Sequence, residues 1–99
     1  MVAQMFNFSV WVPEVDPFIL RERYNSLLKH SGFGVLSFLE YHFEPFGYTA
    51  LWLLSESHFA IHTFPEEGKS YIEISSCIEA QYVKFLEGHC LFPIVDEIM

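Results

Sequence analysis

The chain has 99 residues, the size of one domain, and 52% of them are hydrophobic, including eleven phenylalanines. Its formal net charge is −8, and its five Lys and Arg residues are too few for the clustered basic surface that nucleic-acid binding requires. No apolar run approaches the roughly 20 residues that cross a bilayer, and the first residues lack the features of a signal peptide. We therefore expect a cytoplasmic protein without a nucleic-acid or membrane partner. The excess of apolar side chains favours a homo-oligomer, because one small core cannot bury all of them.

The first third of the chain predicts a strand followed by a helix. Residues 5–12 are rich in aromatic and β-branched types, which favour strands. Asp16 and Pro17 are typical of a helix N-cap and first helical position, and Gly32 and Gly34 mark its end. Between them one apolar stripe recurs at helical spacing, formed by Leu20, Tyr24, Leu27 and Leu28.

The middle of the chain predicts four more strands joined by short turns. They span residues 35–43, 49–55, 59–64 and 70–78. The last strand alternates, so that Ile72, Ile74 and Ile78 share one face and Cys77 lies on the other, more polar face. We expect the isoleucines to pack under the helices.

The end of the chain predicts a second helix and an irregular tail. The helix is expected over residues 79–87, ended by Gly88, and the segment from Leu91 contains Pro93, which favours an edge strand or irregular structure. The order of elements indicates a single α+β domain over residues 1–99. Its antiparallel β-sheet carries helices packed on one face, as a two-layer sandwich.

Residues 56–66, ESHFAIHTFPE, combine a serine, two histidines and two glutamates. A metal site built from His58, His62 and either Glu66 or Cys77 is disfavoured, because the four residues of strand between the two histidines span about 13 Å. A hydrolase with Ser57 as nucleophile and a histidine base is weakly supported, because the G-x-S-x-G pattern is absent.

The same run is preceded by HFEPFGYT at residues 42–49 and followed by Cys77. Together these segments resemble the prokaryotic S-adenosylmethionine decarboxylase family. Its pattern is close to H-x-F-x-P-x-G-x-S, then E-S-H-x-x-I-H-T-W-P-E, then a cysteine some twenty residues past the serine. The likeness covers residues 42–77, more than a third of the chain.

The resemblance implies a self-cleaving proenzyme. The bond between Glu56 and Ser57 would break, giving a β chain of residues 1–56 and an α chain of residues 57–99 that begins with a covalent pyruvoyl group derived from Ser57. His62 resembles the family's processing histidine, and Thr49 stands where a serine supports processing. Strand alternation places Ser57 and His62 on opposite faces, so a twist, a bulge or a contact through a neighbouring strand would have to bring them together.

The resemblance also implies a decarboxylase of polyamine biosynthesis, acting as a homodimer of cleaved protomers. The pyruvoyl ketone would form a Schiff base with a small cationic substrate, and the acidic charge of the chain suits such a ligand. Cys77 resembles the proton donor, Phe43 an aromatic that stacks on adenine, and Glu66 a glutamate that binds ribose hydroxyls.

Several positions depart from the family pattern. Thr49 replaces a serine, Phe64 replaces a tryptophan, and the segment between the Pro-Glu turn and Cys77 differs as well. The resemblance therefore favours S-adenosylmethionine as substrate and leaves two alternatives open. One is a diverged decarboxylase of ornithine or arginine, and the other is an unprocessed, non-catalytic homologue.

Overall fold

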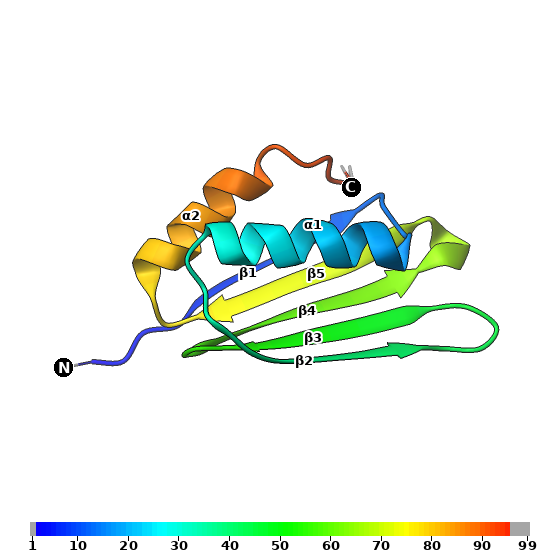
Figure 1. Ribbon diagram of the computed structural model, residues 1–99. Helices are drawn as coiled ribbons and strands as arrows, with labels where there is room; N and C mark the ends of the chain where they lie inside the picture. Colours follow the sequence, from blue (N-terminus) through cyan, green and yellow to red (C-terminus); the bar gives the residue numbers. More distant parts are fainter. Residues whose placement is uncertain (1, 96–99) are drawn as a thin grey trace.

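The computed structural model describes residues 2–95, which form one five-stranded sheet and two helices (Figure 1). The elements in chain order are β1 (Phe6–Val12), α1 (Pro17–His30), β2 (Val35–His42), β3 (Tyr48–Leu54), β4 (Ser57–Phe64), a 3₁₀ turn (Pro65–Glu67), β5 (Lys69–Ser76) and α2 (Glu79–His89). The strand order is β1-β5-β4-β3-β2, and each neighbouring pair is antiparallel. The predicted α+β fold is confirmed.

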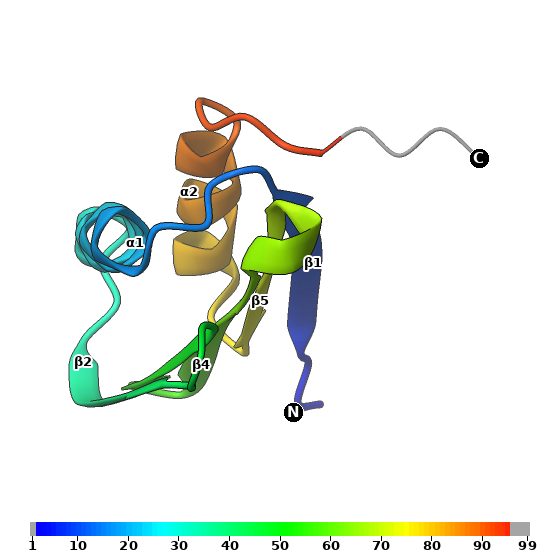
Figure 2. The same cartoon turned by 90° about the vertical axis from the view of Figure 1, so that its right-hand side faces the viewer.

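Both helices lie on the same side of the sheet, and none of the described residues forms a helix over the opposite face (Figure 2). The predicted stripe on α1 is buried, and Ile72 and Ile74 of β5 are fully buried beneath the helices, as alternation indicated. The opposite face carries exposed apolar side chains on two neighbouring strands, namely Leu39, Tyr41, Leu51 and Leu53. We refer to it as the open face.

The start of α1 follows the predicted capping pattern. The Asp16 side chain accepts a hydrogen bond of 3.0 Å from the backbone N–H of Ile19, and Pro17 occupies the first turn, where a missing N–H leaves no helical bond unmade. The helix ends at His30, followed by Gly32 at φ +95°, a conformation that favours glycine. Local signals in the sequence therefore set where this helix begins and ends.

The predicted end of the second helix is wrong, because α2 continues through Gly88 to His89. A Cβ atom at position 88 would lie 2.5 Å from Cδ1 of Leu27, so the missing side chain allows α2 to approach α1 closely. His89 is consequently buried, and its Nε2 lies 2.8 Å from the Tyr24 hydroxyl. Burial, assisted by the charge of Arg23, lowers the pKa of His89 to about 4.

The segment after α2 is irregular over residues 91–95, and the remainder of the predicted tail lies outside the described residues. The backbone N–H of Val95 donates a 2.8 Å hydrogen bond to the carbonyl of Trp11, at the outer strand of the sheet. Within residues 2–95, no helix is both long enough and apolar enough to span a bilayer.

Candidate active site

The bond between Glu56 and Ser57 lies at the tight turn that joins β3 to β4. Only Ser55 and Glu56 separate the two strands, so β4 begins at Ser57, two residues earlier than predicted. Glu56 adopts φ +59°, the left-handed region that side chains with a Cβ rarely enter. Ser57, by contrast, is regular strand and is 7% exposed. The predicted cleavage site therefore coincides with the one non-glycine residue of positive φ in the described part of the chain.

Cys77 lies against the carbonyl group of Glu56. Its backbone N–H donates to the Glu56 oxygen over 3.3 Å, and its thiol sulfur is 3.1 Å from the same oxygen. Register explains this approach, because Ser57 pairs with Ser76 across β4 and β5 and Cys77 is the next residue. Two donors therefore converge on the carbonyl that precedes Ser57.

Ser76 is a neighbour of Ser57 that the sequence interpretation missed. The Ser57 hydroxyl donates to Ser76 Oγ over 2.7 Å, and both side chains are buried on the helix side of the sheet. A small hydroxyl residue immediately before Cys77 was visible in the sequence. Its partner was not, because the pairing depends on the register of two strands.

Thr49 and His62 form a second group. They are direct cross-strand partners on β3 and β4, and Thr49 Oγ1 lies 3.2 Å from His62 Nδ1. The ring of Tyr71 flanks the imidazole at a centroid distance of 6.3 Å.

Phe43 and Glu66 follow the ends of β2 and β4, so they lie at the same end of the sheet as Thr49 and His62, and both are exposed.

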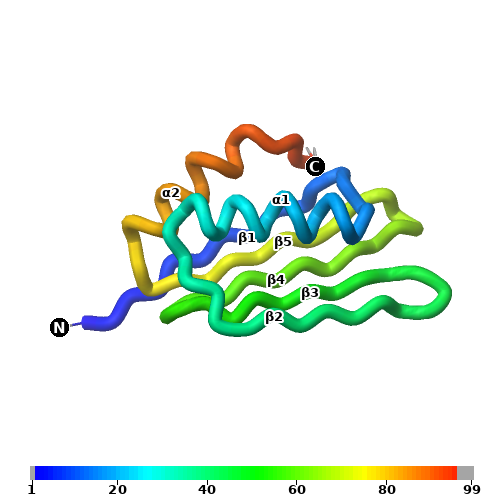
Figure 3. The backbone as a smooth tube through the Cα atoms, in the orientation of Figure 1, coloured from blue at the N-terminus to red at the C-terminus, as the bar shows by residue number. Residues whose placement is uncertain are grey.

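The two groups lie at opposite ends of the sheet, as the path of the chain shows (Figure 3). The turn at Glu56 is at one end, and the hairpin between β2 and β3 is at the other. Ser57 and His62 are five residues apart on a strand without a bulge, which separates them by about 17 Å and places them on opposite faces. Neither a bulge nor a neighbouring strand brings them together within one chain.

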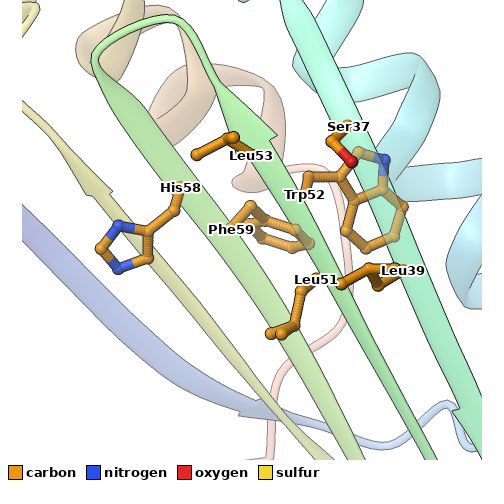
Figure 4. A pocket seen from close by; sticks show the side chains of 7 residues that line it. All are labelled: Ser37, Leu39, Leu51, Trp52, Leu53, His58 and Phe59. Atoms are coloured by element: carbon orange, nitrogen blue, oxygen red, sulfur yellow. The ribbon is translucent and has the colours of Figure 1, made fainter.

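The open face contains an apolar hollow of about 300 Å³ over β2, β3 and β4 (Figure 4). Its lining comprises Ser37, Leu39, Leu51, Trp52, Leu53, His58 and Phe59. His58, the histidine next to Ser57, lines this hollow. Among residues 2–95 there is no group of three His, Cys, Asp or Glu side chains that could hold a metal ion. Cys77 and Cys90 are both free and exposed thiols.

The antiparallel sheet with helices on one face defines a two-layer α+β protein, in which Ser57 and Cys77 lie beside the carbonyl group of Glu56. The family model described as S-adenosylmethionine decarboxylase matches residues 15–89. The chain belongs to this S-adenosylmethionine decarboxylase family.

Individual relatives are similar over part of their length. The S-adenosylmethionine decarboxylase proenzyme of Prochlorococcus marinus is 39% identical over 62 residues, which are 63% of this chain and 50% of that protein. S-adenosylmethionine decarboxylase proenzyme 2 of Bacillus cereus is 46% identical over 48 residues, 48% of this chain and 39% of that protein. The chain thus matches about half the length of these curated relatives, or less.

The fold is also found in a solved structure. The crystal structure of the adenosylmethionine decarboxylase from Aquifex aeolicus superimposes with a TM-score of 0.74 and covers 98% of this chain and 97% of that one. The sequence identity of this pair is 20%, so the likeness concerns the fold.

Proposed function

We propose that this chain is the proenzyme of a pyruvoyl-dependent S-adenosylmethionine decarboxylase of polyamine biosynthesis, which cleaves itself between Glu56 and Ser57. One observation carries the proposal. The carbonyl oxygen of Glu56 accepts hydrogen bonds from the backbone and the thiol of Cys77, while the serine that follows it has a buried hydroxyl. The names of the relatives, which are proenzymes of this activity, agree with it.

The arrangement suits the first step of self-cleavage. Ser57 Oγ attacks the Glu56 carbonyl carbon, the C–N bond breaks, and the hydroxyl proton passes to the nitrogen, which leaves an ester and a free amine. Negative charge develops on the Glu56 oxygen during the attack, where the N–H and S–H of Cys77 stabilise it as an oxyanion hole would. The left-handed backbone of Glu56 stores strain of about 1 kcal/mol that the rearrangement can release.

The second step requires a base. Removal of the α-proton of Ser57 expels Oγ together with Glu56 as a carboxylate, and hydrolysis of the resulting dehydroalanine releases ammonia and leaves the pyruvoyl group. An imidazole suits this proton transfer near neutral pH, and His62 is the histidine of the family motif. In one chain, however, His62 lies about 17 Å along the strand from Ser57.

A homodimer resolves this separation. A twofold axis between the two groups of residues would place the Ser57 and Cys77 group of one protomer beside the Thr49 and His62 group of its partner, twice over. The open face supports such pairing, because its exposed leucines and its hollow are apolar surface that a dimer would remove from contact with water. We therefore propose a dimer through the open face, with each site shared by two protomers.

The same residues suit decarboxylation after cleavage. A pyruvoyl group supplies a ketone that condenses with a primary amine and withdraws the electrons left when CO₂ departs. The exposed thiol of Cys77 adjoins that position and would return a proton to the substrate carbon. Phe43 would stack on adenine, and the Glu66 carboxylate would bind ribose hydroxyls. The net charge of −8 favours a cationic substrate such as a sulfonium.

Intact mass spectrometry of the purified protein tests the cleavage. We expect two chains, split between residues 56 and 57, whose summed mass equals the precursor plus one water and minus one ammonia. Release of CO₂ from carboxyl-labelled S-adenosylmethionine, ornithine and arginine then tests the substrate. A chain that stays whole would refute the proposal in favour of a non-catalytic homologue, and reaction with the amino acids alone would refute the substrate.

Complementation tests the shared site. A tagged Ser57→Ala chain and a His62→Ala chain are each expected to remain uncleaved when produced alone. Produced together, they form mixed dimers in which an intact Ser57 meets an intact His62, so the His62→Ala chain should be cleaved. Absence of cleavage in the mixture, with mixed dimers recovered on the tag, would contradict the shared site.

A further inference from the structure

The Ser57 hydroxyl has one hydrogen-bond partner among the described residues, the hydroxyl of Ser76. The two oxygens lie 2.7 Å apart, Ser57 is 7% exposed and Ser76 is fully buried. They are direct cross-strand partners on β4 and β5, and each of these strands is also paired on its other side, to β3 and to β1 respectively. The contact is therefore built into the sheet and does not depend on a mobile loop.

The direction of the hydrogen bond between Ser57 and Ser76 follows from the two backbone groups of Ile78 beside it. The backbone N–H of Ile78 donates to Ser76 Oγ over 3.0 Å, at the point where the chain enters α2. The Ser76 hydroxyl donates in turn to the Ile78 carbonyl over 3.5 Å, so Ser76 Oγ accepts from the Ser57 hydroxyl. The Ser57 proton is consequently directed at Ser76, and the lone pairs of Ser57 Oγ stay available for a carbonyl carbon.

We propose that Ser76 is a positioning residue for self-cleavage, which holds the Ser57 hydroxyl in the rotamer that attacks the Glu56 carbonyl. This inference rests on the proposed function. A serine side chain otherwise has three staggered rotamers, and misplacement of a nucleophile by about 1 Å can cost on the order of 100-fold in rate. Cys77 then polarises the carbonyl while its neighbour Ser76 aims the nucleophile.

The proposed role is confined to the precursor. When the ester is eliminated, the bond between Cβ and Oγ of residue 57 breaks and Oγ leaves as an oxygen of the Glu56 carboxylate. The group that Ser76 held is therefore absent from the α chain. Loss of the Ser76 hydroxyl should slow cleavage and leave decarboxylation by already cleaved protein unchanged, a split that general damage to the fold would not produce.

The test compares Ser76→Thr with Ser76→Val, because these side chains have nearly the same shape and differ in the hydroxyl. Ser76→Ala is added as the simple deletion. The matched control is Ser70→Ala, on the same strand and face, since Ser70 is also fully buried and donates a 2.7 Å hydrogen bond, to the Glu14 carbonyl. Cleavage is followed by gel and mass after synthesis, and CO₂ release is expressed per reactive carbonyl.

We expect Ser76→Ala and Ser76→Val to cleave about 10- to 100-fold more slowly than the parent chain, with Ser76→Thr faster than Ser76→Val and Ser70→Ala normal. In a His62→Ala chain the ester should accumulate, and hydroxylamine, which cleaves esters, then reports how much has formed. Hydroxylamine should cleave a large fraction of His62→Ala chains that keep Ser76 and a much smaller fraction of those that also carry Ser76→Ala. Parental rates in Ser76→Ala, or equal rates in the Thr and Val variants, would overturn the inference. A parent chain that never cleaves would instead refute the proposed function.

Discussion

Thr49 and His62 face one another across β3 and β4, with Thr49 Oγ1 3.2 Å from His62 Nδ1. This contact uses one ring nitrogen and leaves Nε2 without a hydrogen-bond partner in the described chain. A histidine held in this way presents one defined nitrogen for proton transfer. The threonine that replaces the family's serine keeps the hydroxyl that the contact needs.

Thr49→Val should slow self-cleavage about tenfold, because it removes the hydroxyl that orients His62 and keeps the side-chain shape. Thr49→Ser should cleave normally. Thr63→Val is the matched control, since Thr63 is on β4 and its buried hydroxyl has no hydrogen-bond partner among residues 2–95. The fraction of cleaved chain is measured against time for each variant. Equal cleavage rates for Thr49→Val and Thr63→Val would show that Thr49 does not have this role.

Cys77→Ala should still cleave, more slowly than the parent, because the backbone N–H of residue 77 continues to bind the Glu56 carbonyl. Its CO₂ release per reactive carbonyl should fall by at least about 100-fold, since the proton donor is lost. Cys90→Ala, which alters the other exposed thiol, serves as control. Undiminished turnover in Cys77→Ala would be inconsistent with the assigned role.

Glu56→Gly should stabilise the precursor by about 1 kcal/mol relative to Glu56→Ala, because alanine bears the cost of φ +59° and glycine does not. Both changes are made in a Ser57→Ala chain to prevent cleavage, and the free energies of unfolding come from urea titration. The comparison with alanine separates the backbone effect from loss of the carboxylate. If the glycine variant is no more stable, residue 56 is not strained.

The buried His89 should make stability depend on pH. Its pKa in the folded chain is about 4, below the ordinary value of 6.5, so the unfolded chain binds the proton more tightly. The free energy of unfolding should therefore be fully present above pH 6.5 and decrease by roughly 3 kcal/mol as the pH falls towards 4. Urea titrations at several pH values measure this, and the dependence should be weaker in His89→Gln but not in His30→Gln.

Local patterns predicted most of the fold. The spacing of Leu20 to Leu28 and the Asp16–Pro17 pair specify α1 without reference to the rest of the chain, and alternation in β5 correctly assigned Ile72 and Ile74 to the core. Gly88 misled the prediction, because glycine there serves contact with Leu27, about sixty residues away in the sequence. Helix ends that depend on such tertiary contacts are not encoded locally.

The site could be predicted only in part. Motif spacing named Ser57, His62 and Cys77, and alternation correctly separated the first two by face. The contacts of Ser57 with Ser76 and of Glu56 with Cys77 arise from strand register, which side-chain periodicity does not fix between strands joined by a turn of unknown length. The left-handed backbone at Glu56 likewise follows from how tightly β3 returns into β4.

The strand order has a consequence for what happens after the backbone is cut. β4 and β5, which would belong to the α chain, lie between β1 on one side and β3 on the other, both from the β chain. The two strands of the α chain are therefore enclosed between strands of the β chain. Two ladders of backbone hydrogen bonds, β1 with β5 and β3 with β4, join the two products. Separation would require the sheet to come apart, so the nicked protein can behave as one molecule although its chain is broken.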